Sequence, residues 1–421
     1  MKTIITGGPI FDSGSGRFED DRILVLEGER IAAIESAANL PSGDTDAEVI
    51  DVDGGHVIPG MIDCHFHLIS RTARNVTDEM ITTGSIEGVL AAERTLEAGV
   101  TTVRDMGCKH RGTYAMREAI AKGLIRGPRA FVAGPNPTGS AAPQAWRNVF
   151  VDGVESVRKA VREERRAGAD FIKLVLSSAD PATGYKRVYR YLTDAEIEAA
   201  ISEAHALGAL TGCHCEGLEA AKAAVDAGMD TIDHGTSLDQ ALVEQMATQG
   251  TYYVPTIWCY LASTQIEWND ITPEEAPAFE ENFEAEHRES FKRALEAGVL
   301  MGAGSDSIEA VPPQDILVRE VEWMVKDGMS ELDALHSATI NAAKILGEEA
   351  DLGSLEAGKL ADVVVLSGDP LDDLRALARP QLVIKGGEVE LDLIGDEEAA
   401  RGHWQAMTET PGNVERVDVW G

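Results

Sequence analysis

The feature that most constrains the fold is a regular alternation of short apolar segments and helical segments across residues 60–356. The apolar segments are short enough to be buried strands. There are eight of them, at residues 61–67, 101–105, 130–133, 171–176, 209–214, 230–234, 252–256 and 299–305. This repeat predicts an α/β fold, most simply a closed parallel (β/α)8 TIM barrel, with a doubly wound open sheet as the alternative.

Helix signals separate most of these segments. Thr193 and Glu196 form a capping box that opens one helix, and Gly208 ends it. A second pattern predicts a single helix that begins after Ser330 and ends before Gly347. These signals support the alternation of strands and helices.

The two ends of the chain have a different pattern, with strand-like segments separated by Gly, Asp and Ser. Residues 1–59 and 357–395 are each too short for a stable β domain, so we expect them to pair into one small composite β-sandwich. The barrel would then span residues 60–356. Residues 396–421 form a C-terminal tail that no pattern assigns.

The net charge restricts the partners of the chain. There are 72 Asp and Glu residues against 37 Lys and Arg, which gives −35 at neutral pH. Nucleic acids and anionic membrane surfaces would repel such a chain, so we expect neither as a partner. Because the acidic residues are spread along the chain and Arg outnumbers Lys, a salt-adapted protein is favoured over an ordinary acidic soluble one.

The sequence also indicates a compartment. No apolar run is long enough to cross a membrane, and the N-terminus lacks the apolar core of a secretory signal. The five cysteines form no CxxC pair and give neither a disulfide framework nor a zinc ribbon. We therefore predict a cytoplasmic protein, consistent with the cytoplasm of a salt-adapted organism.

Residue types that bind metals lie at the C-terminal ends of several predicted strands, where a parallel barrel carries its functional groups. His65 and His67 end the first strand, and their i, i+2 spacing lets both rings face one side and take one metal ion. Taken alone, this pair has an alternative, two buried histidines bonded to the backbone.

Three more candidates follow the same rule. His214 ends the fifth strand, His234 ends the sixth, and Asp306 follows the eighth. Imidazole suits zinc, and histidines from separate strands can converge at one end of a barrel. Each residue has an ordinary alternative, a core histidine or a helix-capping aspartate. Together with His65 and His67, they predict a metal centre.

Lys173 lies inside the apolar fourth strand, where a charged amine is costly unless it is paired or neutral. A salt bridge with a carboxylate of the barrel is one explanation. The sharper hypothesis is a lysine carboxylated by CO2, which would become an anionic ligand able to bridge two cations. Four histidines, Asp306 and Lys173 would then make a two-metal site.

Several motifs of the chain resemble those of the amidohydrolase superfamily. They are IPGMIDCHFH at residues 58–67, TTVRD at 101–105, FIK at 171–173, DHG at 233–235, GSD at 304–306, ATINAAKILG at 338–347 and GSLEAGKLADVVV at 353–365. The pattern is most similar to metal-dependent prolidases and Xaa-Pro or Xaa-Arg carboxypeptidases, which are related to imidazolonepropionase. Carbamate, phenylurea and mycotoxin amide hydrolases share it.

The resemblance implies a (β/α)8 barrel with a composite β-sandwich and a binuclear site, most simply with zinc. In that site, the expected ligands are His65, His67 and Asp306 for one metal, His214 and His234 for the other, and carboxylated Lys173 as the bridge.

This set of ligands predicts a mechanism. A hydroxide that bridges the two metals would attack a carbonyl carbon, and one metal would polarise the carbonyl oxygen. Asp306 is expected to take the proton and to deliver it to the leaving amine. We therefore predict a metal-dependent hydrolase that cleaves an amide, peptide or carbamate C–N bond of a small molecule, in the manner of a dipeptidase, a carboxypeptidase or an N-acyl amino acid hydrolase.

One region departs from the family pattern. Peptidase-like members often carry a Gly-Gly-His loop after the third strand, whereas residues 138–147 contain no histidine. Arg147 and Asn148 are candidate replacements, with a solvated loop as the alternative. Tyr253 is a candidate substrate contact or a core aromatic residue. Among the remaining histidines, we expect His287 at the surface.

Two other functions stay open. The first is a mononuclear cyclic-amide hydrolase or deaminase of the imidazolonepropionase type, against which Lys173 argues because such enzymes generally lack that ligand. The second is a non-catalytic scaffold, against which the complete ligand set argues. A homo-oligomer is compatible with a barrel of this kind.

Overall fold

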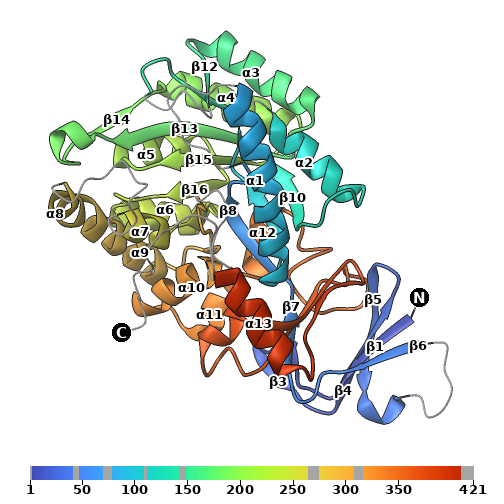
Figure 1. Cartoon of the computed structure of the whole chain (residues 1–421). Helices are drawn as coiled ribbons and strands as arrows, with labels where there is room; N and C mark the ends of the chain where they lie inside the picture. Colours follow the sequence, from blue (N-terminus) through green and yellow to red (C-terminus); the bar gives the residue numbers. More distant parts are fainter. Residues whose placement is uncertain are drawn as a thin grey trace.

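The computed structural model describes residues 2–40, 47–69, 78–108, 111–142, 148–263, 275–307 and 316–408. These residues form an α/β part from the middle of the chain and a β-rich part where strands from both chain ends meet (Figure 1). None of the described helices is long and apolar enough to cross a membrane.

The β-rich part contains two sheets. The four-stranded sheet has the order β5-β4-β1-β6, and its strands are β1 (Lys2–Thr6), β4 (Arg22–Glu27), β5 (Arg30–Ser36) and β6 (Ala47–Asp51). The six-stranded sheet has the order β20-β19-β18-β7-β2-β3, and its strands are β2 (Ile10–Asp12), β3 (Arg17–Glu19), β7 (His56–Pro59), β18 (Val363–Leu366), β19 (Pro380–Lys385) and β20 (Glu388–Asp392).

The second sheet joins the two chain ends directly. Val364 of β18 pairs with Ile58 of β7 in antiparallel register. One buried cluster contains Leu24 from the first sheet together with Val57 and Val365 from the second. The ends of the chain are therefore held together by backbone pairing and by a shared apolar core, while the domain boundaries at residues 59 and 357 stay predictions.

In the α/β part, seven of the eight predicted segments form strands, and all neighbours among them are parallel. One sheet has the order β10-β9-β8 and another the order β14-β13-β15-β16-β17, in which the edge strand β14 runs antiparallel to β13. The strands are β8 (Met61–Phe66), β9 (Val100–Asp105), β10 (Arg129–Val132), β13 (Ile172–Ala179), β15 (Thr211–Cys215), β16 (Thr231–His234) and β17 (Tyr252–Val254). Three short strands, β11 (Asn136–Thr138), β12 (Asn148–Phe150) and β14 (Val188–Arg190), complete the described set.

The eighth predicted strand, residues 299–305, forms no regular strand; Met301 makes only an isolated parallel bridge with Tyr253. The segment nevertheless lies against β8, because the amide of Cys64 donates to the carbonyl of Ala303 at 2.8 Å. A Cβ atom on Gly304 would come within 2.7 Å of the His65 Cβ. Glycine allows this close approach but weakens a strand, which explains the difference.

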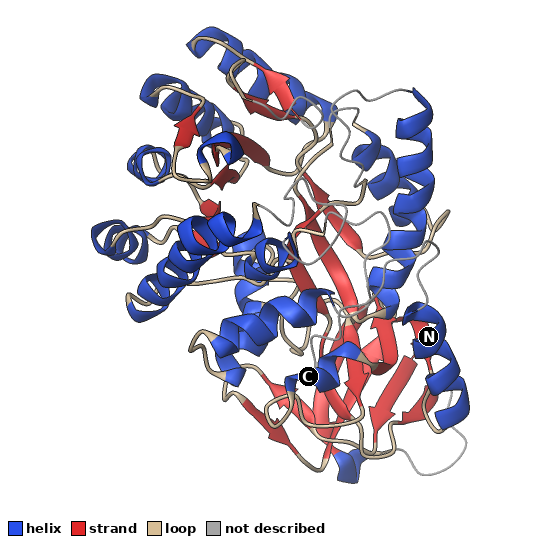
Figure 2. Cartoon of the chain, turned by 60° about the vertical axis from the view of Figure 1, so that its left-hand side comes forward, coloured by secondary structure: helices blue, strands red, loops and turns tan. Residues whose placement is uncertain are grey.

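Helices surround the parallel strands (Figure 2). They are α1 (Asp78–Glu97), α2 (Gly112–Ala121), α3 (Val154–Ala167), α4 (Asp194–Ala206), α5 (Leu218–Asp226), α6 (Gln240–Gln249), α7 (Ile257–Ser263), α8 (Ala276–Phe279), a π-helical turn (Glu280–Glu284), α9 (Ala285–Glu296), α10 (Ile316–Lys326), α11 (Glu331–Ser337), α12 (Ile340–Leu346) and α13 (Glu397–Thr408). Short 3-10 helices span Ala37–Asn39, Pro181–Thr183 and Leu374–Ala378.

The two helix predictions made from the sequence have different outcomes. The capping box at the start of α4 is present as predicted. The single helix predicted before Gly347 is wrong, because the chain breaks it into α11 and α12 at Thr339, whose φ of −134° and ψ of −101° are not helical. The hydroxyl of Thr339 donates instead to the Leu335 carbonyl at 2.7 Å. Helix α13 lies in the tail that no sequence pattern assigned.

Candidate metal centre

The parallel strands bring the predicted ligands to one place. His65 lies near the end of β8, and His67 follows that strand. Lys173 lies in β13, next to Gly212 of β15 across the ladder. Cys215 of β15 pairs with His234, the last residue of β16. The register therefore brings strands that carry predicted ligands next to one another.

A compact group forms around Asp306. Its Oδ1 atom lies 3.1 Å from Nε2 of His67 and 3.3 Å from Nε2 of His65. The Nζ atom of Lys173 lies 3.4 Å from the same Nε2 of His65. His65, His67 and Asp306 each offer a ligand atom within 4.8 Å of the others, and all three are buried. This set could hold one metal ion.

The two remaining histidines adjoin this group. The ring centroid of His234 lies 4.9 Å from that of His65 and 4.4 Å from that of His214. Nδ1 of His234 is 3.9 Å from Oδ2 of Asp306. All six residues predicted as ligands therefore lie in one continuous cluster.

Further polar side chains contact the histidines from outside the cluster. Nδ1 of His65 lies 2.9 Å from Oδ2 of Asp233, and Asp233 also accepts two hydrogen bonds from Arg104, at 2.8 and 2.9 Å. Nδ1 of His234 lies 2.7 Å from Oγ1 of Thr256. Such contacts fix which ring nitrogen faces inward.

His214 has its own neighbours. Its Nε2 atom lies 3.1 Å from Oγ of Ser178 and 3.5 Å from Oε1 of Glu216. Glu216 accepts a hydrogen bond from the Tyr260 hydroxyl at 2.8 Å. Sequence reasoning missed these three neighbours and gave Asp233 and Arg104 no role. The only signal was that Arg104 and Asp233 lie within the TTVRD and DHG motifs.

The backbone is strained at two of the predicted ligands. His234 has a φ of +71° and Asp306 a φ of +42°, both in the left-handed region that non-glycine residues rarely adopt. Such conformations cost about 1–3 kcal/mol each and cluster at functional sites. The hydroxyl of Tyr253 donates to the His234 carbonyl at 2.9 Å and so supports one of them.

Four further residues that the sequence singled out have other outcomes. Tyr253 is fully buried behind His234, which favours the core-aromatic alternative, while a contact with substrate stays a prediction. Arg147 lies outside the described residues, as does the side chain of Asn148. The surface prediction for His287 is wrong: its side chain is fully buried in α9, with its ring 5.1 Å from that of Tyr260.

Burial and neighbouring charges set the ionisation of the cluster. Burial lowers the pKa of His65, and the charge of Lys173 lowers it further. The pKa of His234 is held well below its usual range by burial and then by His214 and His65. Burial opposes ionisation of Asp306, but His65 and His67 keep its pKa well below the ordinary value. Neutral imidazoles and an ionised carboxylate are the forms that bind metals.

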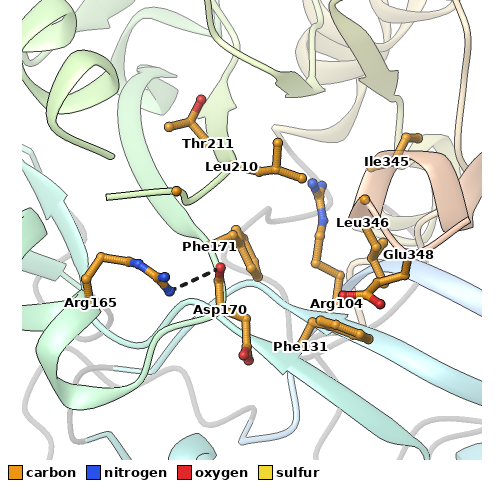
Figure 3. Close-up of a pocket in the computed structure, with 12 residues that line it drawn as sticks. Arg104, Phe131, Arg165, Asp170, Phe171, Leu210, Thr211, Ile345, Leu346 and Glu348 are labelled. Atoms are coloured by element: carbon orange, nitrogen blue, oxygen red, sulfur yellow. Dashed lines mark hydrogen bonds between the residues drawn. The ribbon is translucent and has the colours of Figure 1, made fainter. Parts of the chain in front are cut away.

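A cavity of about 440 Å³ lies at the opposite end of the parallel strands. Its lining includes Phe171 before β13, Leu210 before β15 and Leu346 at the end of α12, and none of the predicted ligands (Figure 3). Arg104 also lines it and is the residue that connects this cavity to Asp233.

Comparison with known proteins gives consistent results. The Amidohydrolase family model matches residues 56–389. Ochratoxinase of Aspergillus niger is 27% identical over 427 aligned positions, which cover 92% of this chain and 86% of that protein. Imidazolonepropionase of Acinetobacter baumannii is 25% identical over 378 positions, covering 84% and 89%. A solved Xaa-Pro dipeptidase with methionine bound in its active site superposes with a TM-score of 0.82 at 31% identity, covering 92% and 99%.

Proposed function

Because the chain belongs to the amidohydrolase family and is a hydrolytic enzyme acting on C–N bonds, we propose that it cleaves an amide, peptide or carbamate bond of a small molecule with divalent metal ions. The observation that carries this proposal is a buried cluster of side chains. Oδ1 of Asp306 lies 3.1 Å from Nε2 of His67 and 3.3 Å from Nε2 of His65, and Nζ of Lys173 lies 3.4 Å from the same atom of His65. A cluster of this composition, held in strained backbone, favours metal-assisted hydrolysis.

The residues present fit a metal site. The hydroxyl of Thr256 donates to the Pro255 carbonyl at 2.7 Å, so its oxygen is left to accept from Nδ1 of His234. Nε2 of His234 then carries a lone pair, and this buried atom has no hydrogen-bond partner among the described residues. A buried acceptor without a donor is costly, and a metal ion would remove that cost.

Two ions, most simply zinc, would be held by the six residues. We assign His65, His67 and Asp306 to one ion, His214 and His234 to the other, and carboxylated Lys173 to both. When bound, such ions supply an activated water at neutral pH and polarise the carbonyl of the substrate.

The chain's own part in the reaction is proton transfer. Asp306 stays ionised in this surrounding, so its Oδ2 atom can accept the proton of the attacking water. The same carboxyl then delivers that proton to the leaving nitrogen as the C–N bond breaks. Because the cluster is buried, bulk water competes little for this proton.

We also propose that the two parallel sheets form one closed barrel beside a composite β-sandwich. The amide of Asp170, just before β13, donates to the Val132 carbonyl of β10 at 2.9 Å, and the amide of Gly302 donates to the Tyr253 carbonyl of β17 at 3.0 Å. The contact of Ala303 with Cys64 completes the circuit to β8. Closure would place all six residues at one mouth.

For the substrate, we favour a dipeptide or an N-acyl amino acid, because the chain is 31% identical to the solved Xaa-Pro dipeptidase. A cyclic amide is the second candidate, on the 25% identity to imidazolonepropionase. The buried Lys173 favours the first, since a bridging ligand serves two ions.

The test is amine release from a mixed panel of substrates, measured at low salt and at high salt. The panel holds Xaa-Pro and Xaa-Arg dipeptides, N-acyl amino acids, aryl carbamates, phenylureas and cyclic imides. Turnover of a dipeptide or an N-acyl amino acid is expected. Turnover of cyclic imides alone would refute the favoured substrate class, and no turnover with the metal-loaded protein on any member would count against the proposed activity.

A further inference from the structure

We propose that Arg104 and Asp233 are positioning residues, whose ion pair fixes the orientation of the His65 ring and the place of its proton. This inference rests on the proposed function, because it takes His65 as a metal ligand. Arg104 lines the cavity of Figure 3, and Asp233 lies between Arg104 and His65 of the metal centre.

Asp233 is the nearer of the two carboxylates that flank the His65 ring, with its Oδ2 atom 2.9 Å from Nδ1, whereas Oδ1 of Asp306 lies 3.3 Å from Nε2. Because an ionised carboxylate can only accept hydrogen bonds, we assign the proton of the ring to Nδ1, the nitrogen that faces Asp233. Nε2 then carries the lone pair, and this is the atom that faces Lys173 at 3.4 Å and Asp306 at 3.3 Å. The ring therefore presents its lone pair to the metal centre.

Arg104 holds Asp233 in turn. Its Nη2 atom donates to both carboxylate oxygens, its Nη1 atom donates to the Thr231 hydroxyl at 3.0 Å, and its Nε atom donates to the Cys64 carbonyl at 2.6 Å. One guanidinium group thus fixes the carboxylate and the residue before His65 together. The single ammonium of a lysine cannot reproduce this planar fork.

The cavity provides a route by which free guanidinium could replace the Arg104 side chain after its removal. Arg104 lines the cavity, and the lining also includes Gly208 and Gly347, which are exposed to solvent. The Arg104 guanidinium already lies over the Phe171 ring at 5.4 Å. In an Arg104→Ala variant, a free guanidinium ion could therefore enter from solvent and occupy the vacated position.

The chain contains a matched control for this ion pair. Arg129 donates to both carboxylate oxygens of Asp362, at 2.7 and 3.3 Å, and to the Thr102 hydroxyl at 3.1 Å. None of these contacts involves a predicted ligand. An Arg129→Ala variant therefore loses the same kind of ion pair without touching the metal centre.

The experiment measures zinc affinity by competition with a chromophoric chelator, and thermal unfolding of the metal-free proteins. Asp233→Asn and Arg104→Ala should each bind zinc about 10–100-fold more weakly than the wild type. Arg129→Ala should bind zinc like the wild type even if it unfolds at a lower temperature. Millimolar guanidinium should restore zinc affinity to Arg104→Ala but not to Asp233→Asn.

The outcomes separate the two proposals. Wild-type zinc affinity in both Asp233→Asn and Arg104→Ala would overturn the positioning role, as would an equal loss in Arg129→Ala. Should Arg104→Ala fail to fold, Arg104→Lys keeps the charge without the fork, and unchanged zinc affinity in this variant would also overturn the role. A wild-type chain that binds no divalent metal would instead overturn the proposed function itself.

Discussion

The two ends of the parallel strands differ in what their side chains do. At the C-terminal end, His65, His67 and Asp306 are buried beside one another, and two of the predicted ligands lie in strained backbone. At the opposite end, Phe171 and Leu346 line an open cavity that contains none of the predicted ligands. The C-terminal end thus carries buried polar groups in strained backbone, whereas the opposite end carries packing side chains together with Arg104, which reaches from the cavity to Asp233.

Asp306→Asn should have the largest effect on activity. The amide cannot accept and deliver the proton, so kcat should fall by about 10²–10⁴-fold while the fold is kept. Steady-state amine release and circular dichroism would measure the two effects. Near-normal turnover in a folded variant would remove Asp306 from proton transfer.

Lys173→Ala removes a buried amine from the same end of the strands. Loss of a bridging ligand should lower metal content and reduce activity by at least about 100-fold, more than the loss of a residue outside the ligand shell. Added short carboxylic acids should restore part of both if a carboxylated lysine is the native ligand. Metal content equal to that of the wild type would contradict the bridging role.

Leu346→Ala changes a side chain at the opposite end of the strands. This mostly buried side chain lines an existing cavity, so its truncation should reduce the free energy of unfolding by about 2 kcal/mol, the lower end of the range for such changes. Zinc affinity should stay unchanged, as equilibrium competition would measure. A loss of metal binding comparable to that of Lys173→Ala would contradict a purely structural role for Leu346.

A smaller effect concerns Glu320, which is fully buried in α10 and accepts hydrogen bonds from the amides of Ile257 and Trp258. Burial raises its pKa to about 8, although both amides oppose this shift. The folded state therefore holds a proton between about pH 4.5 and 8 that the unfolded state has lost, and stability should fall as pH rises through that window, by up to about 1.4 kcal/mol per pH unit.

Glu320→Gln should remove this contribution to the slope. The variant loses one acceptor for a backbone amide, so it should be less stable than the wild type near pH 5 and recover relative to it toward pH 9. Urea unfolding at a series of pH values would measure the difference. Parallel stability curves for the two proteins would contradict a raised pKa for Glu320.

The candidate ligands could be proposed from the sequence because each follows from a local rule. His65 lies near the end of one strand with His67 just after it, and His234 is the last residue of another strand. Their neighbours could not be predicted in the same way. The contact between His65 and Asp233, or between Asp233 and Arg104, depends on which distant strands become adjacent.

The remaining differences also have tertiary causes. Close packing of Gly304 against β8 replaces a regular eighth strand by a single bridge. The packing of α9 against Tyr260 buries His287, which was expected at the surface. Local pattern thus indicated most elements and the predicted ligands, whereas the supporting contacts required the structure.

If the six residues form one site for two metal ions, each wild-type chain should retain two divalent ions. Elemental analysis after reconstitution with zinc and removal of unbound metal would measure this number. One ion per chain would contradict the bridging role of Lys173 and favour the mononuclear alternative, and no bound ion would contradict the site as a whole.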